Sequence, residues 1–295
     1  MTPHIPGYEL LQPALLRNGW GSDVYRARRV GSDTVVLVKV YGPHLNPDEP
    51  ARQRFHSNCK VLARLSHPNI VRFHDHGDAD ERFYVCTEYL EGGNLLDRLR
   101  LGGPLAPRTA AHSFALLADA LQYLHGEGIV HRNLNLDHVV FSASGMPKLT
   151  GFRLIDPIVA PDIPGPVVGT PRYMAPEQLR GLEARPATDV WGLGAVLYEA
   201  LTGRAPFSGN ATIDLLLQII EAAPQRPRQV RPEIPTVLEL ICLKCLEKDP
   251  ERRYRSAKDL ADDLRAFLED RPTEAGRLAA ERRRSFWQRL FAWGR

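Results

Sequence analysis

The chain lacks long apolar runs and contains few cysteines. No segment of its 295 residues approaches the ~18 consecutive apolar residues of a membrane-spanning helix. The start MTPHIPGYEL lacks the basic and apolar regions of a secretory signal. Four cysteines are too few for a disulfide scaffold at this length, and the sequence shows no internal repeat. We therefore expect a globular protein that works in the cytoplasm.

Two of the cysteines, Cys242 and Cys245, form a C-x-x-C pair inside the run VLELICLKCLEKDP. Such pairs can bind metals or carry redox chemistry. Helical spacing, however, places both on the face that also carries Leu238 and Ile241. The sequence therefore predicts that both thiols are packed in a core.

The formal net charge is only +3, and it is unevenly distributed, because seven of the 38 basic residues lie in 271–295. The segment 281–295 reads ERRRSFWQRLFAWGR and places Phe286, Leu290 and Trp293 at helical spacing, with arginines opposite. A basic amphipathic helix with tryptophans suits an anionic membrane surface. It equally suits docking on the protein's own body or on a partner, so three roles stay open. No nucleic-acid partner is expected.

The pattern of apolar residues divides the chain into a strand-rich part and a helical part. Residues 8–90 contain alternating or short apolar runs typical of strands, and 50–65 has the periodicity of a helix. Beyond residue 94 helical stripes dominate. They run over 109–127, 190–201, 213–220, 237–246 and 257–268. The segment 157–166 is rich in proline and is expected to be a loop.

Four ordered motifs in the second half carry the most information. They are HRNLNLDH at 131–138 with GFR at 151–153, GTPRYMAPE at 169–177, DVWGLG at 189–194, and CLEKDPERRY at 245–254. Together they resemble the Hanks-type (eukaryotic-like) serine/threonine protein kinases of bacterial type, whose catalytic loop is H-R-D-x-K-x-x-N and whose metal motif is D-F-G. The resemblance covers roughly residues 8 to 268.

The resemblance implies an α+β, bilobal protein-kinase-like fold. A small β-rich lobe with one main helix would span residues 1–90, and a larger, mainly helical lobe would span 91–270. The basic tail would follow as 271–295. Five framework residues are implied to hold this fold together: His131, Phe152, Glu177, Asp189 and Arg253. Of these, Glu177 and Arg253 are implied to form a buried ion pair.

The same resemblance implies that the chemical groups of the site are replaced. Asn133 stands for the catalytic aspartate, Asn135 for a lysine, His138 for the magnesium-binding asparagine and Gly151 for the metal-binding aspartate. An asparagine cannot accept a proton, and a lone imidazole is a poor magnesium ligand. We therefore expect no intact catalytic residue and no metal. Substitution by the nearby carboxylates of Asp137 or Asp156 remains an alternative.

The nucleotide-binding positions are only partly retained. Lys39 matches the lysine that contacts ATP phosphates, and further contacts are implied for Gly19, Val24, Glu88 and Leu90. Four positions depart from the family pattern: Arg17 and Ser22 replace glycines, Leu37 replaces a small alanine and Asn58 replaces the glutamate that pairs with the lysine. Because extra carbons narrow the slot for the adenine ring, we expect no cofactor, and weak ATP binding without metal is the alternative.

These substitutions lead to an expectation about function. The chain is predicted not to be an enzyme, but a catalytically inactive protein-kinase-like domain that acts as a protein-binding or allosteric signalling module. Its partner would be another protein, for example an active kinase. Two alternatives are an atypical serine/threonine protein kinase with weak ATP-dependent activity, and a nucleotide sensor that needs no metal.

Overall fold

The computed structural model describes residues 3–11, 16–18, 22–42, 49–80, 82–154, 171–209, 212–281 and 284. The contacts divide the chain into two compact units. The N-unit comprises Met1–Gly92 with Phe152–Gly169, and the C-unit comprises Gly93–Gly151 with Thr170–Arg295. Gly19, Asp156, the expected loop at 157–166 and nearly all of the tail 281–295 lie outside the described residues.

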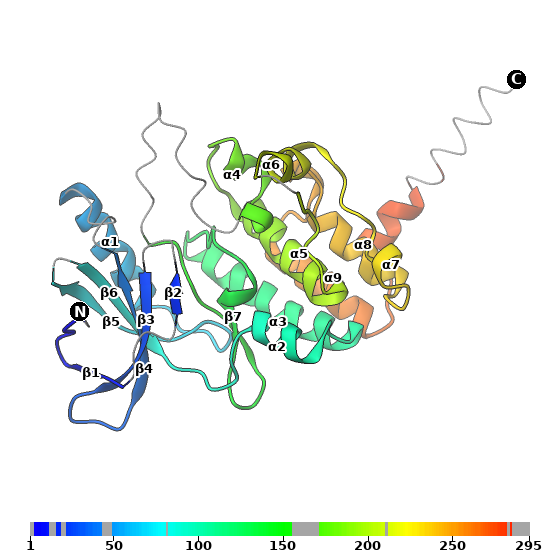
Figure 1. Cartoon of the computed structure of the whole chain (residues 1–295). Coiled ribbons are helices and arrows are strands. Elements are labelled where there is room, and N and C mark those ends of the chain that lie inside the picture. Colours follow the sequence, from blue (N-terminus) through cyan, green and yellow to red (C-terminus); the bar gives the residue numbers. More distant parts are fainter. Residues whose placement is uncertain are drawn as a thin grey trace, which may run out of the picture. The chain divides into compact units, whose positions relative to one another are not determined.

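The N-unit is built on one antiparallel sheet (Figure 1). Its strands are β1 (Tyr8–Leu10), β2 (Leu16–Asn18), β3 (Ser22–Arg29), β4 (Val35–Tyr41), β5 (Phe73–Ala79) and β6 (Arg82–Glu88). The strand order is β1-β3-β4-β6-β5, with β2 paired to β3. The strand character predicted for residues 8–90 is confirmed in the described part of that range. Strand β5 could not be singled out from the sequence, because FHDHGDA has little apolar alternation.

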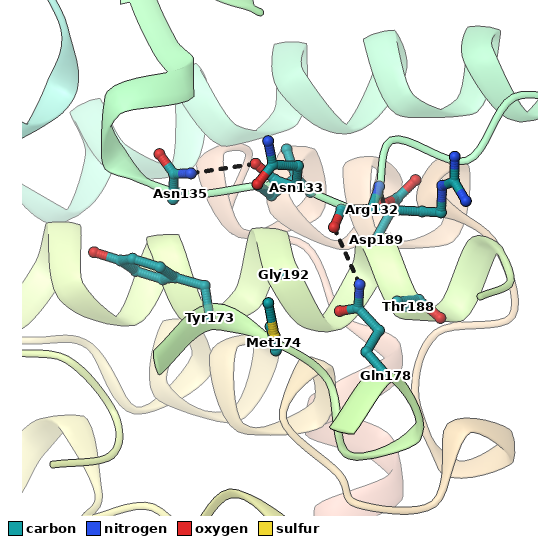
Figure 2. A pocket seen from close by; sticks show the side chains of 10 residues that line it. Arg132, Asn133, Asn135, Tyr173, Met174, Gln178, Thr188, Asp189 and Gly192 are labelled. Carbon is teal, nitrogen blue, oxygen red and sulfur yellow. Dashed lines mark hydrogen bonds between the residues drawn. The ribbon is translucent and has the colours of Figure 1, made fainter. Parts of the chain in front are cut away.

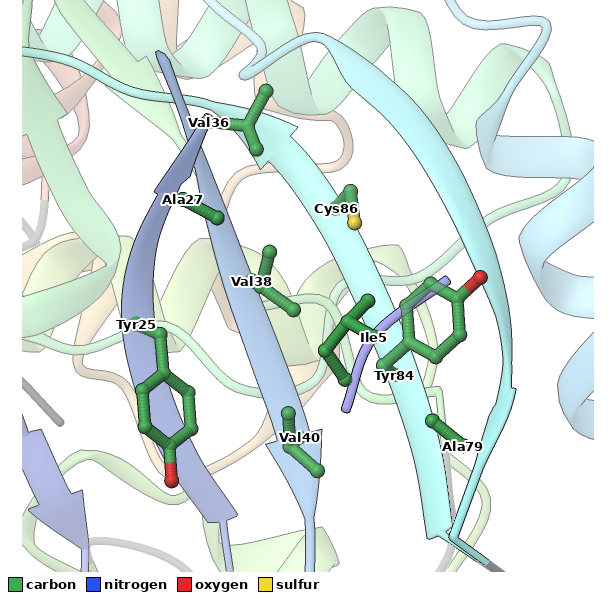
Figure 3. Close-up of a cluster of buried hydrophobic side chains, with 9 residues drawn as sticks. All are labelled: Ile5, Tyr25, Ala27, Val36, Val38, Val40, Ala79, Tyr84 and Cys86. Carbon is green, nitrogen blue, oxygen red and sulfur yellow. The ribbon is translucent and has the colours of Figure 1, made fainter. Parts of the chain in front are cut away.

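The sheet has two chemically different faces because side chains alternate along a strand. One face carries the buried cluster drawn in Figure 3, to which Tyr25, Val38 and Tyr84 belong. Ile5, which precedes β1, packs on this face and is 1% exposed. The opposite face carries Val24 and Lys39, which are direct partners in the register of β3 and β4.

Helix α1 (Glu49–Leu62) covers part of the second face. Its Phe55 is fully buried and stacks on Phe83 of β6 with a centroid distance of 4.4 Å. Phe55 also meets Tyr41 edge to face at 6.0 Å. Aromatic pairs in these geometries add to the gain from area burial, so Phe55 fixes α1 against the sheet.

The C-unit is helical. Its helices are α2 (Leu95–Gly102), α3 (Pro107–Gly126), α4 (Pro176–Leu179), α5 (Pro186–Thr202), α6 (Thr212–Glu221), α7 (Pro227–Val230), α8 (Thr236–Cys245) and α9 (Ala257–Leu268), and β7 (Val139–Phe141) pairs with β8 (Pro147–Leu149). The five helical stripes predicted after residue 94 are confirmed. The α+β class is confirmed as well. No helix in the described ranges combines the length and the apolar character needed to span a bilayer.

Helix α5 is the centre of the C-unit, since every residue from Thr188 to Thr202 is buried. Helix α8 lies close against it. An added Cβ at Gly194 would lie 2.3 Å from the Cβ of Cys245, and the thiol of Cys242 donates to the Gly194 carbonyl at 3.7 Å. Both cysteines are fully buried, which confirms the predicted packing role and explains why a glycine faces them.

A buried ion pair joins α4 to the segment before α9. Arg253 donates from Nη1 to Glu177 Oε1 at 2.7 Å and from Nη2 to Oε2 at 2.9 Å. Thr188 adds a third donor to the carboxylate at 2.9 Å. Burial alone raises the pKa of Glu177, but the hydrogen bonds and charge of Arg253 outweigh it, and the pKa is lowered. The pair is therefore fully satisfied in the fold.

Replacing Arg253 with methionine is expected to destabilise the protein by about 3–5 kcal/mol, because the Glu177 carboxylate stays buried without its partner. Arg252→Met is the matched control, since Arg252 is exposed and only near Asp249 at 3.6 Å, and exposed pairs contribute about 0–1 kcal/mol. Urea unfolding of both variants measures the difference. Equal midpoints for the two variants would show that the buried pair does not stabilise the fold.

Candidate active site

In the N-unit, Lys39 lies half-buried on the second face of the sheet, opposite Val24 on β3 and Val85 on β6. Removal from water lowers the pKa of its amine. Its Nζ lies 5.0 Å from the centroid of the Tyr41 ring, and no described carboxylate forms an ion pair with it. Asn58, at the position of the expected glutamate, donates instead to the Leu154 carbonyl at 3.3 Å. Lys39 is thus held by an aromatic ring, where relatives of the family would have an ion pair.

The other nucleotide-site candidates of the N-unit lie on both faces of the sheet. Leu37 is opposite Arg26 and Thr87, on the same face as Lys39. Glu88 pairs with Val36 and therefore belongs to the core-side face; its Oε1 accepts from the Arg72 backbone at 2.8 Å. Leu90 lies two residues after the end of β6 and is partly buried.

In the C-unit, Asp189 at the start of α5 fixes the backbone of the loop that follows α3. Its Oδ2 accepts from the backbone N–H of His131 at 2.8 Å, and its Oδ1 accepts from that of Arg132 at 2.9 Å. The buried His125 bonds to Oδ2 through Nε2 at 2.8 Å. Arg132 has φ +62°, a conformation that costs energy for a residue with a Cβ. The bonds to Asp189 therefore hold a loop that would not keep this shape alone.

The replaced positions form a network of their own. Asn135 Oδ1 accepts from the backbone N–H of Asp137 at 2.9 Å and of His138 at 3.1 Å, so it caps the short turn Leu136–His138. This fixes its Nδ2 as the donor to the Asn133 carbonyl at 3.3 Å. His138 Nδ1 lies 2.6 Å from the same carbonyl and 2.9 Å from Asn135 Nδ2. Because a carbonyl oxygen can only accept, we assign the proton to Nδ1. Asn135 and His138 thus close the loop by direct hydrogen bonds.

Gly151 is fitted to His138. Its φ is +77°, and an added Cβ would lie 2.2 Å from Cδ2 of the imidazole. Its carbonyl accepts from Asn133 Nδ2 at 2.9 Å. The ring of His138 therefore fills the volume that a side chain at position 151 would need, and the two substitutions belong together.

Magnesium, which kinases use, does not fit the described side chains. Their donors at this place are amides and an imidazole, whereas magnesium prefers carboxylates and water. Within the described ranges, no group of three or more His, Cys, Asp or Glu side chains could hold a metal ion. Asp137, one of the two alternative carboxylates, accepts from Asn94 at 3.3 Å, and burial together with Asp97 raises the pKa of its carboxyl.

A pocket opens beside this loop within the C-unit (Figure 2). It is lined by Arg132, Asn133, Leu134, Asn135, Tyr173, Met174, Gln178, Thr188, Asp189 and Gly192. Most of its polar groups are already bonded: Gln178 Nε2 donates to the Arg132 carbonyl at 3.1 Å, and the Tyr173 hydroxyl donates to Glu199 at 2.8 Å. The pocket is therefore preformed, and Asn133 is one of the residues that line it.

Sequence reasoning missed Arg26. Its guanidinium lies 4.8 Å from the centroid of the Tyr89 ring, and its buried Nε has no hydrogen-bond partner among the described residues. A signal for its position was present, because Arg26 follows Val24 by two residues in DVYRARRV and so shares its face. The signal was weak, because the second half of this strand contains three arginines and gives no clear apolar alternation.

The comparisons with known proteins agree with this fold. A profile of the family described as "Protein kinase domain" matches residues 14–264. Serine/threonine-protein kinase PrkC of Bacillus subtilis is 32% identical over 270 residues, which is 90% of this chain and 41% of that protein. Serine/threonine-protein kinase PkaA of Streptomyces coelicolor is 37% identical over 88% of this chain and 50% of its own length. The chain thus spans half or less of these relatives.

Solved structures show the same fold. The PknI kinase domain of Mycobacterium tuberculosis superimposes with a TM-score of 0.70 at 24% identity, covering 90% of this chain and 96% of that one. Rad53 1–466, solved in complex with AMP-PNP, gives a TM-score of 0.75 at 24% identity, with coverages of 91% and 67%. The expected bilobal kinase-like fold is therefore confirmed.

One expectation is wrong. The absence of carboxylates at positions 133 and 151 led us to expect a protein that is not an enzyme. Relatives that are 32% to 37% identical over most of the chain are named serine/threonine-protein kinases, and they point to an enzyme. The substitutions show how this site differs from the family pattern, but they do not establish that the protein is inactive. By its profile match and its relatives, the chain belongs to the protein kinase family and resembles the bacterial Hanks-type serine/threonine kinases.

Proposed function

We propose that the chain is an atypical serine/threonine protein kinase that transfers phosphoryl groups from ATP slowly. The observation that carries this proposal is the catalytic loop, whose backbone is held by Asp189 through two N–H donors in a chain related over most of its length to kinases. Phosphoryl transfer depends mainly on positioning. A loop that keeps its shape retains that part of catalysis.

The side chains set the expected rate. Asn133 Oδ1 can accept a hydrogen bond from an acceptor hydroxyl and orient it, but an amide cannot take its proton. General acid–base catalysis contributes on the order of 10²–10⁴-fold, so the rate should fall by about this factor. No step is assigned to a metal, because the described donors do not fit one.

The pocket of Figure 2 supports a protein substrate. It lies next to Asn133, and its walls are fixed by bonds of Gln178 and Tyr173. A serine or threonine of an extended peptide would place its hydroxyl at the Asn133 amide. The acceptor is therefore proposed to be another protein.

A protein-binding or allosteric role is the second candidate. The network of Asn133, Asn135 and His138 closes the catalytic loop without any ligand, so the surface around the pocket is formed in advance. Preformed surfaces lose little conformational entropy on binding. In this case the protein would bind its partner whether or not a phosphoryl group is transferred to it.

Transfer is tested with radiolabelled ATP, a generic serine/threonine substrate and either magnesium, manganese or EDTA. Slow incorporation is expected, and Lys39→Met should abolish it. The variant should not be less stable, because the folded-state pKa of Lys39 is lowered, so the folded state disfavours the charged amine below that pKa. A thermal melt checks this. Incorporation by the wild type that does not exceed that of a folded Lys39→Met variant would contradict the proposal.

The fit between His138 and Gly151 predicts that a carboxylate cannot be restored alone. Gly151→Asp should lower the melting temperature by several degrees, as expected for an overpacking cost of about 1–3 kcal/mol. The double variant His138→Asn with Gly151→Asp should recover most of this loss and gain a stabilisation by manganese.

Gly145→Asp is the matched control for backbone strain, because Gly145 has φ +82° and an added Cβ there meets nothing within 4 Å. It should cost less than Gly151→Asp. Two results would show that the imidazole does not occupy the space at position 151. One is an equal melting temperature for Gly145→Asp and Gly151→Asp, and the other is a double variant that melts no higher than Gly151→Asp alone.

A further inference from the structure

The chain becomes helical again after α9. Residues 274–281 form a helix, called here the exit helix, and Arg284 is helical as well. Asp263 of α9 holds the first turn, because its carboxylate accepts from the backbone N–H of Glu274 at 2.6 Å and of Ala275 at 2.9 Å. A carboxylate at this place satisfies N–H groups that have no partner within the helix. The exit helix is therefore fixed to the C-unit at its start.

Further contacts secure the same turn. The buried Thr273 accepts through Oγ1 from the backbone N–H of Gly276 at 3.1 Å, as a capping residue does. Lys244 of α8 donates to the Glu274 carboxylate at 2.5 Å, and Ala275 is only 4% exposed. Figure 1 shows the exit helix in red beside α8. Its first turn is thus anchored to both α8 and α9.

Beyond its first turn the exit helix is largely surrounded by solvent. The exposed residues lie on several sides of the helix, and they are Arg277, Leu278, Ala280, Glu281 and Arg284. A helix that docked along the C-unit would bury one whole side. These exposures therefore disfavour docking of the tail segment 281–295 on the protein's own body, which is one of the three roles that the sequence leaves open.

The described surface also offers little for such docking. Of its exposed large apolar side chains, Ile213 and Leu217 lie one helical turn apart on α6, with exposures of 61% and 48%. A pair of this size is small compared with the apolar face of the tail, and single exposed apolar residues are ordinary on a protein surface. We therefore look for the partner of the tail outside the protein.

The sequence of the tail indicates the chemistry of that partner. Residues 282–295 contain five arginines and no acidic residue. Helical spacing predicts two neighbouring apolar rows, formed by Phe286, Leu290 and Trp293 and by Trp287 and Phe291. A protein groove usually takes one such row. A wide apolar face with tryptophans, bordered by arginines, suits the boundary between acyl chains and anionic headgroups.

We propose that the tail segment 281–295 binds the surface of an anionic phospholipid membrane as an amphipathic helix, and that the exit helix connects this contact to the C-unit. The apolar face enters the boundary region, and the arginines neutralise the headgroups. Both contributions are needed, because either signal alone gives weak and reversible binding. The contact holds the pocket of the C-unit near the membrane surface and does not depend on phosphoryl transfer.

The test is flotation of the full chain with vesicles of phosphatidylcholine alone or of phosphatidylcholine mixed with phosphatidylglycerol. The chain should float with the mixed vesicles and far less with the neutral ones, and binding should fall as salt is raised. The double variant Trp287→Ala with Trp293→Ala should bind about tenfold more weakly or worse, because apolar burial is lost. Arg284→Gln with Arg289→Gln should lose a similar factor, because less charge faces the headgroups.

Two matched controls change the same properties elsewhere on the C-unit. Arg204→Gln with Arg228→Gln removes equal charge from exposed positions, and Ile213→Ser with Leu217→Ser removes exposed apolar area from α6. Both should bind vesicles like the wild type, and melting curves check that every variant is folded.

Three results would overturn the membrane contact. The first is a folded wild type that does not float with the mixed vesicles, as expected if the tail recognises a protein instead. The second is flotation that is equal with neutral and mixed vesicles, or tail variants that bind like the controls. The third is vesicle binding that becomes several-fold tighter in the Ile213→Ser with Leu217→Ser variant, because this would show that the tail is held on α6.

Discussion

The catalytic region depends on one carboxylate, that of Asp189. It is buried at the start of α5 and accepts from the backbone of His131 and Arg132 and from the ring of His125. A buried charge is tolerated only when its acceptors are used, and here the donors also impose the loop's shape, including the positive φ of Arg132. Because α5 is itself buried from Thr188 to Thr202, the loop is anchored to the core of the C-unit.

The side chains that depart from the family pattern in this loop are complementary to one another. Asn135 caps the turn, His138 bonds to the Asn133 carbonyl, and Gly151 leaves room for the imidazole. The side chain at each of these positions therefore fits only because of the residues at the others, as expected in a packed, hydrogen-bonded network. The site is thus reorganised. Its side chains can orient an acceptor hydroxyl by hydrogen bonds, but they do not suit metal binding or proton abstraction.

Much of this could be predicted from the sequence. The long helices follow from apolar stripes, and the Glu177–Arg253 pair follows from ordered motifs. Strand β5 could not be predicted, since FHDHGDA has no apolar alternation and is stabilised by pairing with β6. The steric fit of His138 to Gly151 and the stacking of Arg26 on Tyr89 were also hidden, because they join residues whose contact depends on tertiary packing. The expectation of a non-enzyme failed because it took the missing groups as decisive and the retained framework as purely structural, whereas the related proteins are named kinases.

The account is tested most directly by mass spectrometry of a serine/threonine peptide library after long incubation with the chain and ATP whose γ-phosphate carries ¹⁸O. The label separates transfer by this protein from phosphate already present on the peptides. We predict phosphopeptides that bear the heavy γ-oxygens, in amounts that rise with time and with protein concentration. Peptides that stay unlabelled at stoichiometric protein, while the fold remains intact, would contradict the claim that this reorganised site still transfers phosphate.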